Sequence, residues 1–157
     1  MKRRIAVALL QLSLVAVGVH AQQVPSNFTP TTPCRLFDSR TGPGQPLQVA
    51  TTYQIAVRGQ CSVPADANAV FLSVVATGAT GPGNVTVWAS DLLQPTATTM
   101  NFRGIGTDSS ATFSRLCAPP YAECGGVDLS IKAGVTPTHV ILDVVGYTQP
   151  LEPVQPN

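Results

Sequence analysis

The sequence predicts an all-β protein, a two-sheet antiparallel β-sandwich of the immunoglobulin-like or jelly-roll type, with about eight strands. Apolar and polar residues alternate over short segments, turn residues recur every ~8–12 positions, and no segment shows a helical period. Residues 69–77 and 138–147 are apolar on both faces. This is typical of strands in the middle of a sheet that has material packed on each side.

The first 21 residues are interpreted as a secretory signal peptide. Basic residues 2–4 precede an apolar run, and Val19-His20-Ala21 has the small residues of a cleavage site. The run of ~15 residues is shorter than the about 20 that a membrane span needs. We therefore expect cleavage after Ala21, a secreted protein in the extracellular space or the periplasm, and no membrane insertion of the mature chain.

The mature chain is long enough for one domain and carries little charge. Without the leader, 136 residues remain, with six basic against eight acidic side chains, so the net charge is near −2. No basic stripe is present. We therefore do not expect nucleic acid as a partner.

Composition divides the mature chain into three parts. Residues 22–33 are proline-rich and predict an extended N-terminal arm, residues 34–148 predict the sandwich, and residues 149–157 predict a disordered proline-rich tail. Glycine- and proline-rich turns separate the alternating segments of the sandwich. The predicted strands are residues 34–40, 52–58, 69–77, 85–89, 98–103, 111–115, 127–133 and 138–147.

Four cysteines follow the leader. An even number in an oxidising compartment predicts two disulfides. Three pairings can form; we favour Cys34–Cys61 with Cys117–Cys124, because the second closes a short loop. A zinc site is disfavoured, since no CxxC occurs, and no calcium-binding DxDxDG run is present. No cofactor is expected.

Four ordered motifs resemble a module common in exported and surface proteins of soil bacteria. They are PCRLFDSR at residues 33–40, GQCSVPADA at 59–67, MNFR at 100–103 and HVILDVVGY at 139–147. The resemblance implies a secreted β-sandwich and supports the Cys34–Cys61 pairing. It brings no catalytic residues, and the segment closed by Cys117 and Cys124 is additional to the pattern.

Catalytic groups are few. His139 and Asp143 share a strand face, but four residues at ~3.3 Å each separate them by about 13 Å, too far for a base and its orienting carboxylate. Asp91, Asp108 and Asp128 could converge as the paired acids of a glycosidase. All three lie near turns, however, where aspartate commonly caps the chain. We therefore predict that the protein is not an enzyme.

Charged residues inside otherwise apolar strands predict a structural ion-pair network. Its members are Asp38, Arg40, Arg103 and Asp143, with Arg35 nearby. We expect one of the aspartates to pair with Arg40 or Arg103 between strands, because a lone buried carboxylate is costly; the alternative is a ligand site. On this view, replacing Asp143 by Ala costs about 3–5 kcal/mol.

These observations predict a structural or adhesive module at the cell surface or in the extracellular matrix. Its expected partners are a second copy, through an edge strand or the arm of residues 22–33, or other surface proteins. The alternative is a carbohydrate-binding module that recognises extracellular polysaccharide. That function would require Trp88 or Tyr121 to be exposed for stacking on sugars.

Overall fold

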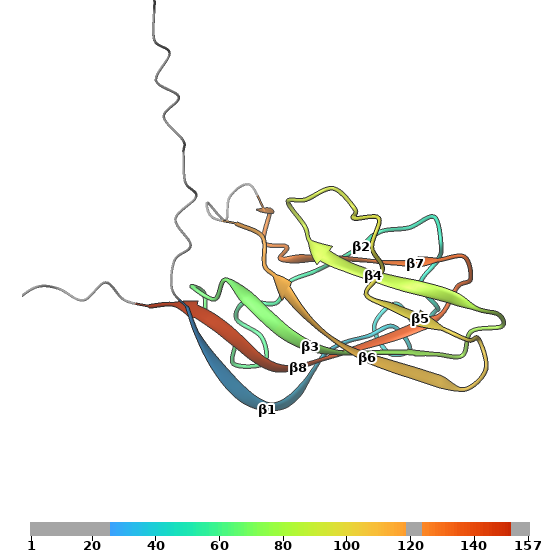
Figure 1. The fold of residues 1–157 in the computed structure, drawn as a ribbon, viewed down its shortest axis with the longest axis horizontal. Helices are drawn as coiled ribbons and strands as arrows, with labels where there is room; N and C mark the ends of the chain where they lie inside the picture. Colours follow the sequence, from blue (N-terminus) through green and yellow to red (C-terminus); the bar gives the residue numbers. More distant parts are fainter. Residues whose placement is uncertain (1–25, 119–123, 152–157) are drawn as a thin grey trace, which may run out of the picture.

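A computed structural model describes residues 26–118 and 124–151 and places them in two antiparallel sheets (Figure 1). The sheet orders are β1-β8-β3-β6 and β2-β7-β4-β5. The all-β sandwich predicted from the alternation is confirmed. Its strands are β1 (Ser26–Asp38), β2 (Tyr53–Ile55), β3 (Ala69–Thr77), β4 (Gly83–Ala89), β5 (Met100–Phe102), β6 (Thr107–Arg115), β7 (Leu129–Gly134) and β8 (His139–Pro150).

The strand order decides between the two predicted sandwich types. The neighbours β1–β8, β2–β7, β3–β6 and β4–β5 pair the first strand with the last, the second with the last but one, and so on to the two middle strands. An antiparallel ribbon of paired strands rolled into two sheets gives this pattern, which is that of a jelly roll. The two strands predicted to be apolar on both faces, β3 and β8, lie at the centre of the first sheet.

The core lies between the sheets. Along β3, Val70, Leu72 and Val74 are fully buried and face it, whereas the alternate residues are partly exposed on the outer face of the first sheet. From the second sheet, Val85 and Ile131 meet them. Burial of each such side chain stabilises the fold by about 1.5–3 kcal/mol. The apolar face of each strand therefore turns toward the other sheet.

The edges of the sandwich domain differ from those expected. The sequence predicts an arm over residues 22–33 and a tail over residues 149–157, yet β1 begins at Ser26 and β8 continues to Pro150, and these ends pair with each other. Prolines are tolerated in β1 because it is an edge strand. The predicted leader (1–21), residues 22–25 and residues 152–157 lie outside the described residues.

Strand β2 is shorter than expected because a side chain takes over its hydrogen bonding. The alternation predicts a strand through Val57, but β2 ends at Ile55. Beyond it, the N–H groups of Val57 and Arg58 donate to the carboxylate of Asp128, at 2.6 and 2.9 Å. The chain therefore leaves the sheet toward this carboxylate.

Candidate functional site

Asp38, at the end of β1, is the centre of an ion-pair cluster on the edge of the first sheet. Its carboxylate accepts hydrogen bonds from Arg40 Nε and Nη2, at 2.9 and 2.7 Å, and from Arg35 Nη1 at 2.9 Å. Arg35 Nε also donates to Asp143 on β8. The cluster thus ties β1 to β8 through Arg35 and Asp143, whereas Arg40 binds Asp38 two residues away and does not make the pair between strands that we expected of it.

Electrostatics in this cluster follow from the arginine contacts. The hydrogen bond from Arg40 holds the pKa of the Asp38 carboxyl well below its usual range, even though burial acts in the opposite direction. The reciprocal hydrogen bonds raise the pKa of Arg35, through Asp143 first, and of Arg40, through Asp38. Both arginines keep about half of their side chains (49%) in solvent. The cluster is therefore a surface ion-pair cluster with one buried carboxylate.

Arg103 does not belong to this cluster, and its predicted role in the network is wrong. It follows β5 in the second sheet, and its guanidinium binds Asp108 at 3.0 Å, across the turn into β6. Its side chain is 83% exposed. A partner five residues further on, at the start of β6, satisfies the charge of Arg103 without any contact with Asp38 or Asp143.

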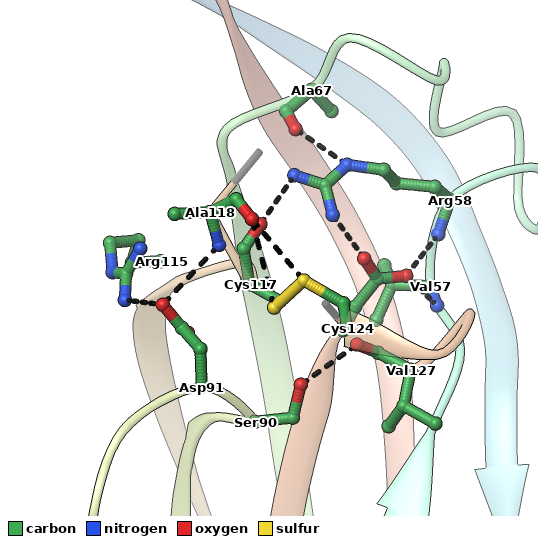
Figure 2. The surroundings of a disulfide bond; sticks show 11 residues. Val57, Arg58, Ala67, Ser90, Asp91, Arg115, Cys117, Ala118, Cys124 and Val127 are labelled. Carbon is green, nitrogen blue, oxygen red and sulfur yellow. Dashed lines mark hydrogen bonds and ion pairs between the residues drawn. A yellow bond between two sulfur atoms is a disulfide. The ribbon is translucent and has the colours of Figure 1, made fainter. Parts of the chain in front are cut away.

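A buried ion pair that the sequence analysis did not identify joins Arg58 and Asp128. Their side chains are only 7% and 5% exposed. Arg58 Nε donates to Ala67 O at 2.8 Å, and Nη2 donates to Cys117 O at 3.1 Å, beside the Cys117–Cys124 disulfide (Figure 2). The pair therefore connects the exit of β2, two loops and the entrance to β7.

The three aspartates considered as paired catalytic acids each bind a different arginine. Asp128 pairs with Arg58 and Asp108 with Arg103, while Asp91 accepts from Arg115 Nη2 at 2.6 Å. Burial is the largest single influence on the pKa of the Asp91 carboxyl and raises it. The hydrogen bonds that this carboxyl accepts, above all the one from Arg115, outweigh burial, so the pKa is lowered. The backbone N–H of Arg103 is the main cause that lowers the pKa of Asp108. At Asp91 and Asp108 the lowered pKa favours the ionised carboxylate of a structural ion pair.

Both predicted disulfides form. The Cα atoms of Cys34 and Cys61 lie 5.5 Å apart and those of Cys117 and Cys124 lie 6.1 Å apart. The first ties β1 to the loop after β2. The second joins Cys117 to Cys124, seven residues apart in the sequence, beside Arg58 (Figure 2).

His139 contacts a buried hydroxyl. Its Nδ1 lies 3.1 Å from Ser39 Oγ, which also accepts the N–H of Val140 at 3.0 Å. Ser39 is completely buried. A hydroxyl without solvent access that holds a backbone N–H is suited to joining β1 to β8, and it is poorly placed to attack a substrate.

Of the two aromatic residues proposed to bind sugars, Trp88 is not exposed as that role would require. Trp88 is buried, and its indole Nε1 donates to Leu92 O at 3.1 Å. Tyr121 lies outside the described residues. Trp88 is therefore part of the packing of the second sheet.

Exposed aromatic rings lie instead on the outer face of the first sheet. Phe28 and Phe113 are 52% and 56% exposed. Phe71 packs edge-to-face with Phe28 at 6.4 Å between ring centroids and lies directly opposite Phe113 in the β3–β6 register. Phe28 also covers Gly146, where an added Cβ would lie 2.4 Å from its ring. We name Phe28, Phe71 and Phe113 the phenylalanine row; alternation along β1, β3 and β6 was the sequence signal for it.

An open polar groove lies at the paired ends of β1 and β8, where Asn27 is opposite Gln149. It has a volume of about 450 Å³ and is lined by Asn27, Thr29, Asp66 and Gln149 with Pro150 and Leu151. Gln149 Nε2 donates to both carboxylate oxygens of Asp66, at 2.9 and 3.0 Å. Amide, hydroxyl and carboxylate groups of this kind can hydrogen-bond a polar ligand.

The described residues contain neither a metal-ligand cluster nor a membrane-spanning helix. Over residues 26–118 and 124–151, no three His, Cys, Asp or Glu side chains gather as a metal site would require. In the same part of the chain, no helix has the length and apolar character needed to cross a membrane.

Comparisons with known proteins add little. No protein-family model matches the chain, and no curated protein matches it. Among solved structures, the chain is similar to the coat protein of Tobacco streak virus, solved as a dimer. The match covers 87% of this chain and 95% of the coat protein chain, with 7% sequence identity and a TM-score of 0.36. A likeness at this level carries no argument about function.

Proposed function

We propose that the chain is a non-enzymatic, secreted structural or adhesive module that acts at the cell surface or in the extracellular matrix. The observation that carries this proposal is the use of charge within the fold. Each of the five arginines that the structure describes pairs with an aspartate of the same chain. Charged groups that an enzyme could use in acid–base chemistry are thus engaged in joining strands and loops.

The two disulfides support the same proposal. Cross-links of this kind persist in oxidising compartments and restrict the unfolded chain. With separations of 27 and 7 residues, they staple one long loop and one short loop of the jelly roll. A durable scaffold outside the cytoplasm is what such staples favour.

Carbohydrate binding is the second candidate function, and the open polar groove is the observation that favours it. Asn27, Thr29 and Gln149 offer amide and hydroxyl groups, and Asp66 offers a carboxylate. The residues that line the groove include no aromatic ring. Sugar binding there would depend on hydrogen bonds without the stacking that Trp88 was expected to provide.

The test is to express the full chain with a C-terminal tag in a bacterial host and to locate the product. We expect cleavage after Ala21, oxidised cysteines, labelling of the tag on intact cells, and sedimentation with the cell envelope. Reduced protein in the cytoplasm, or oxidised protein free in the medium, contradicts the proposal. Retention on a polysaccharide that is competed by its soluble oligosaccharide and lost in Asp66→Ala supports the second candidate.

A further inference from the structure

The four edge strands of the sandwich are not equally protected against pairing with another chain. Strands β2 and β5 have three residues each, which leaves little backbone to pair. Strand β1 contains Pro30 and Pro33, and its register against β8 shifts twice. Short length, proline and register breaks are the usual protections of a sheet edge.

Strand β6 has none of these protections. Its nine residues pair with β3 from Thr107 to Arg115 without a register shift, and none of them is proline. Its charged residues, Asp108 and Arg115, stand near the ends and are already bound to Arg103 and Asp91. The six residues between them are uncharged, and over the described residues the sheet has no strand beyond β6 (Figure 1).

We infer that β6 is the self-association edge of this module and pairs antiparallel with β6 of a second copy. Resting on the proposed structural role, the inference specifies the partner and the surface. A two-fold axis normal to the sheet joins the two sheets β1-β8-β3-β6 into one continuous sheet. Because both copies use the same edge, the assembly closes as a dimer and does not extend into a fibre.

The chemistry of β6 fits its own copy. The two-fold axis sets outer-face residues against outer-face residues, so a register centred on Ala111 places Ser109 opposite Phe113 and Thr107 opposite Arg115 of the partner. No charge then faces a like charge. The acidic end of each strand lies beside the basic end of the other, which is the complementarity that an antiparallel self-pair requires.

The phenylalanine row gives this pairing an apolar component. Phe113 is 56% exposed at the edge and stands opposite Phe71. In the dimer, each Phe113 ring lies over the small side chains of the partner's β6, on the same side of the joined sheet. Burial of these rings adds to the backbone hydrogen bonds, which alone would accept any extended peptide.

The experiment uses the oxidised mature chain, residues 22–157, and measures its mass by sedimentation over a concentration series. We expect a monomer–dimer equilibrium, and Ala111→Lys should weaken dimerisation about tenfold or more, because it brings like charges together at the axis. The matched control is Thr32→Lys, a change at a position that is also exposed but lies on the protected edge β1, and it should leave dimerisation unchanged.

Hydrogen exchange at low and high protein concentration provides a second readout that needs no variant. Protection gained on β6 amides as the dimer forms supports the inference. Protection gained on β1 or elsewhere with β6 unchanged overturns it, as does a mature chain that stays monomeric at every concentration. A monomer that still sediments with the cell envelope contradicts this edge alone, and the proposed structural role stands.

Discussion

The Arg58–Asp128 pair and the Asp38 cluster use the same residue types in opposite surroundings. In the first, both side chains are at least nine-tenths buried, and Asp128 also accepts two backbone N–H groups. In the second, Asp38 is buried but Arg35 and Arg40 are half exposed. Both groups of ion pairs connect segments that are far apart in the sequence. What differs between them is the dielectric environment of the charges.

Contact geometry alone therefore does not determine how much an ion pair contributes to the stability of the fold. A buried charge that loses its partner cannot be rehydrated, so breaking the pair is costly even if the intact pair is no more stable than an apolar replacement. An exposed arginine that loses its partner returns to water at little cost. Loss of one partner is therefore expected to destabilise the fold strongly at the buried pair and only weakly at the surface cluster.

The largest effect is expected for Asp128→Ala. The change leaves the Arg58 guanidinium and two backbone N–H groups without their acceptor. We expect the free energy of unfolding to fall by about 3–5 kcal/mol, measured by urea denaturation of the oxidised protein.

A double variant tests whether the loss reflects a stranded charge. Arg58→Met with Asp128→Leu removes both charges and should recover a large part of the stability lost in Asp128→Ala. If the single variant loses less than about 1 kcal/mol, the buried pair behaves like a surface pair and the comparison fails.

A smaller effect, dependent on pH, is expected at Asp38. Its pKa in the folded state lies below the ordinary value near 4, so the carboxylate contributes its full stability above about pH 4 and loses it as the pH falls further. At neutral pH, Asp38→Asn should cost about 1–2 kcal/mol, since hydrogen bonds to a charged group are lost. The difference from the unaltered protein should shrink toward about pH 2.

Arg40→Gln sharpens this prediction. It removes the hydrogen bond that most lowers the pKa of Asp38, so acid unfolding should begin at a higher pH than in the unaltered protein. Urea midpoints over a pH series measure the shift. Parallel pH profiles for Asp38→Asn and the unaltered protein would show that Asp38 has no part in acid unfolding.

Patterns within single strands predicted the sandwich and its two central strands, because alternation is a local signal. The short spacing of Cys117 and Cys124 favoured the second disulfide, and the resemblance to an exported module supported the Cys34–Cys61 pairing. They did not reveal the Arg58–Asp128 pair, whose members are 70 residues apart and each lie just outside a strand. Asp128 was interpreted as a turn residue and Arg58 as the end of a strand. Only the jelly-roll topology, which makes β2 and β7 neighbours, brings them together.

The same limit explains the errors at Arg103 and Trp88. An arginine after an alternating segment looks the same in sequence whether its partner lies far along the chain or nearby, and here the partner is Asp108, five residues further on at the start of β6. Trp88 alternates with apolar residues, which suggested an exposed ring. The loop after β4 instead brings Leu92 O within 3.1 Å of its indole. Side-chain exposure depends on loops that alternation does not predict.

The smallest effect is expected for Asp143→Ala, and it corrects the 3–5 kcal/mol that followed from treating this carboxylate as deeply buried. The Asp143 side chain is 23% exposed, and its partner Arg35 is 49% exposed and also binds Asp38. We therefore expect a loss of about 1 kcal/mol or less. A double-mutant cycle of Asp143→Ala with Arg35→Ala, followed by urea denaturation, isolates the pair. A coupling energy near that of a buried pair would show that Arg35 and Asp143 depend on each other as strongly as Arg58 and Asp128 are expected to. A small coupling energy would support the distinction between the surface cluster and the buried pair.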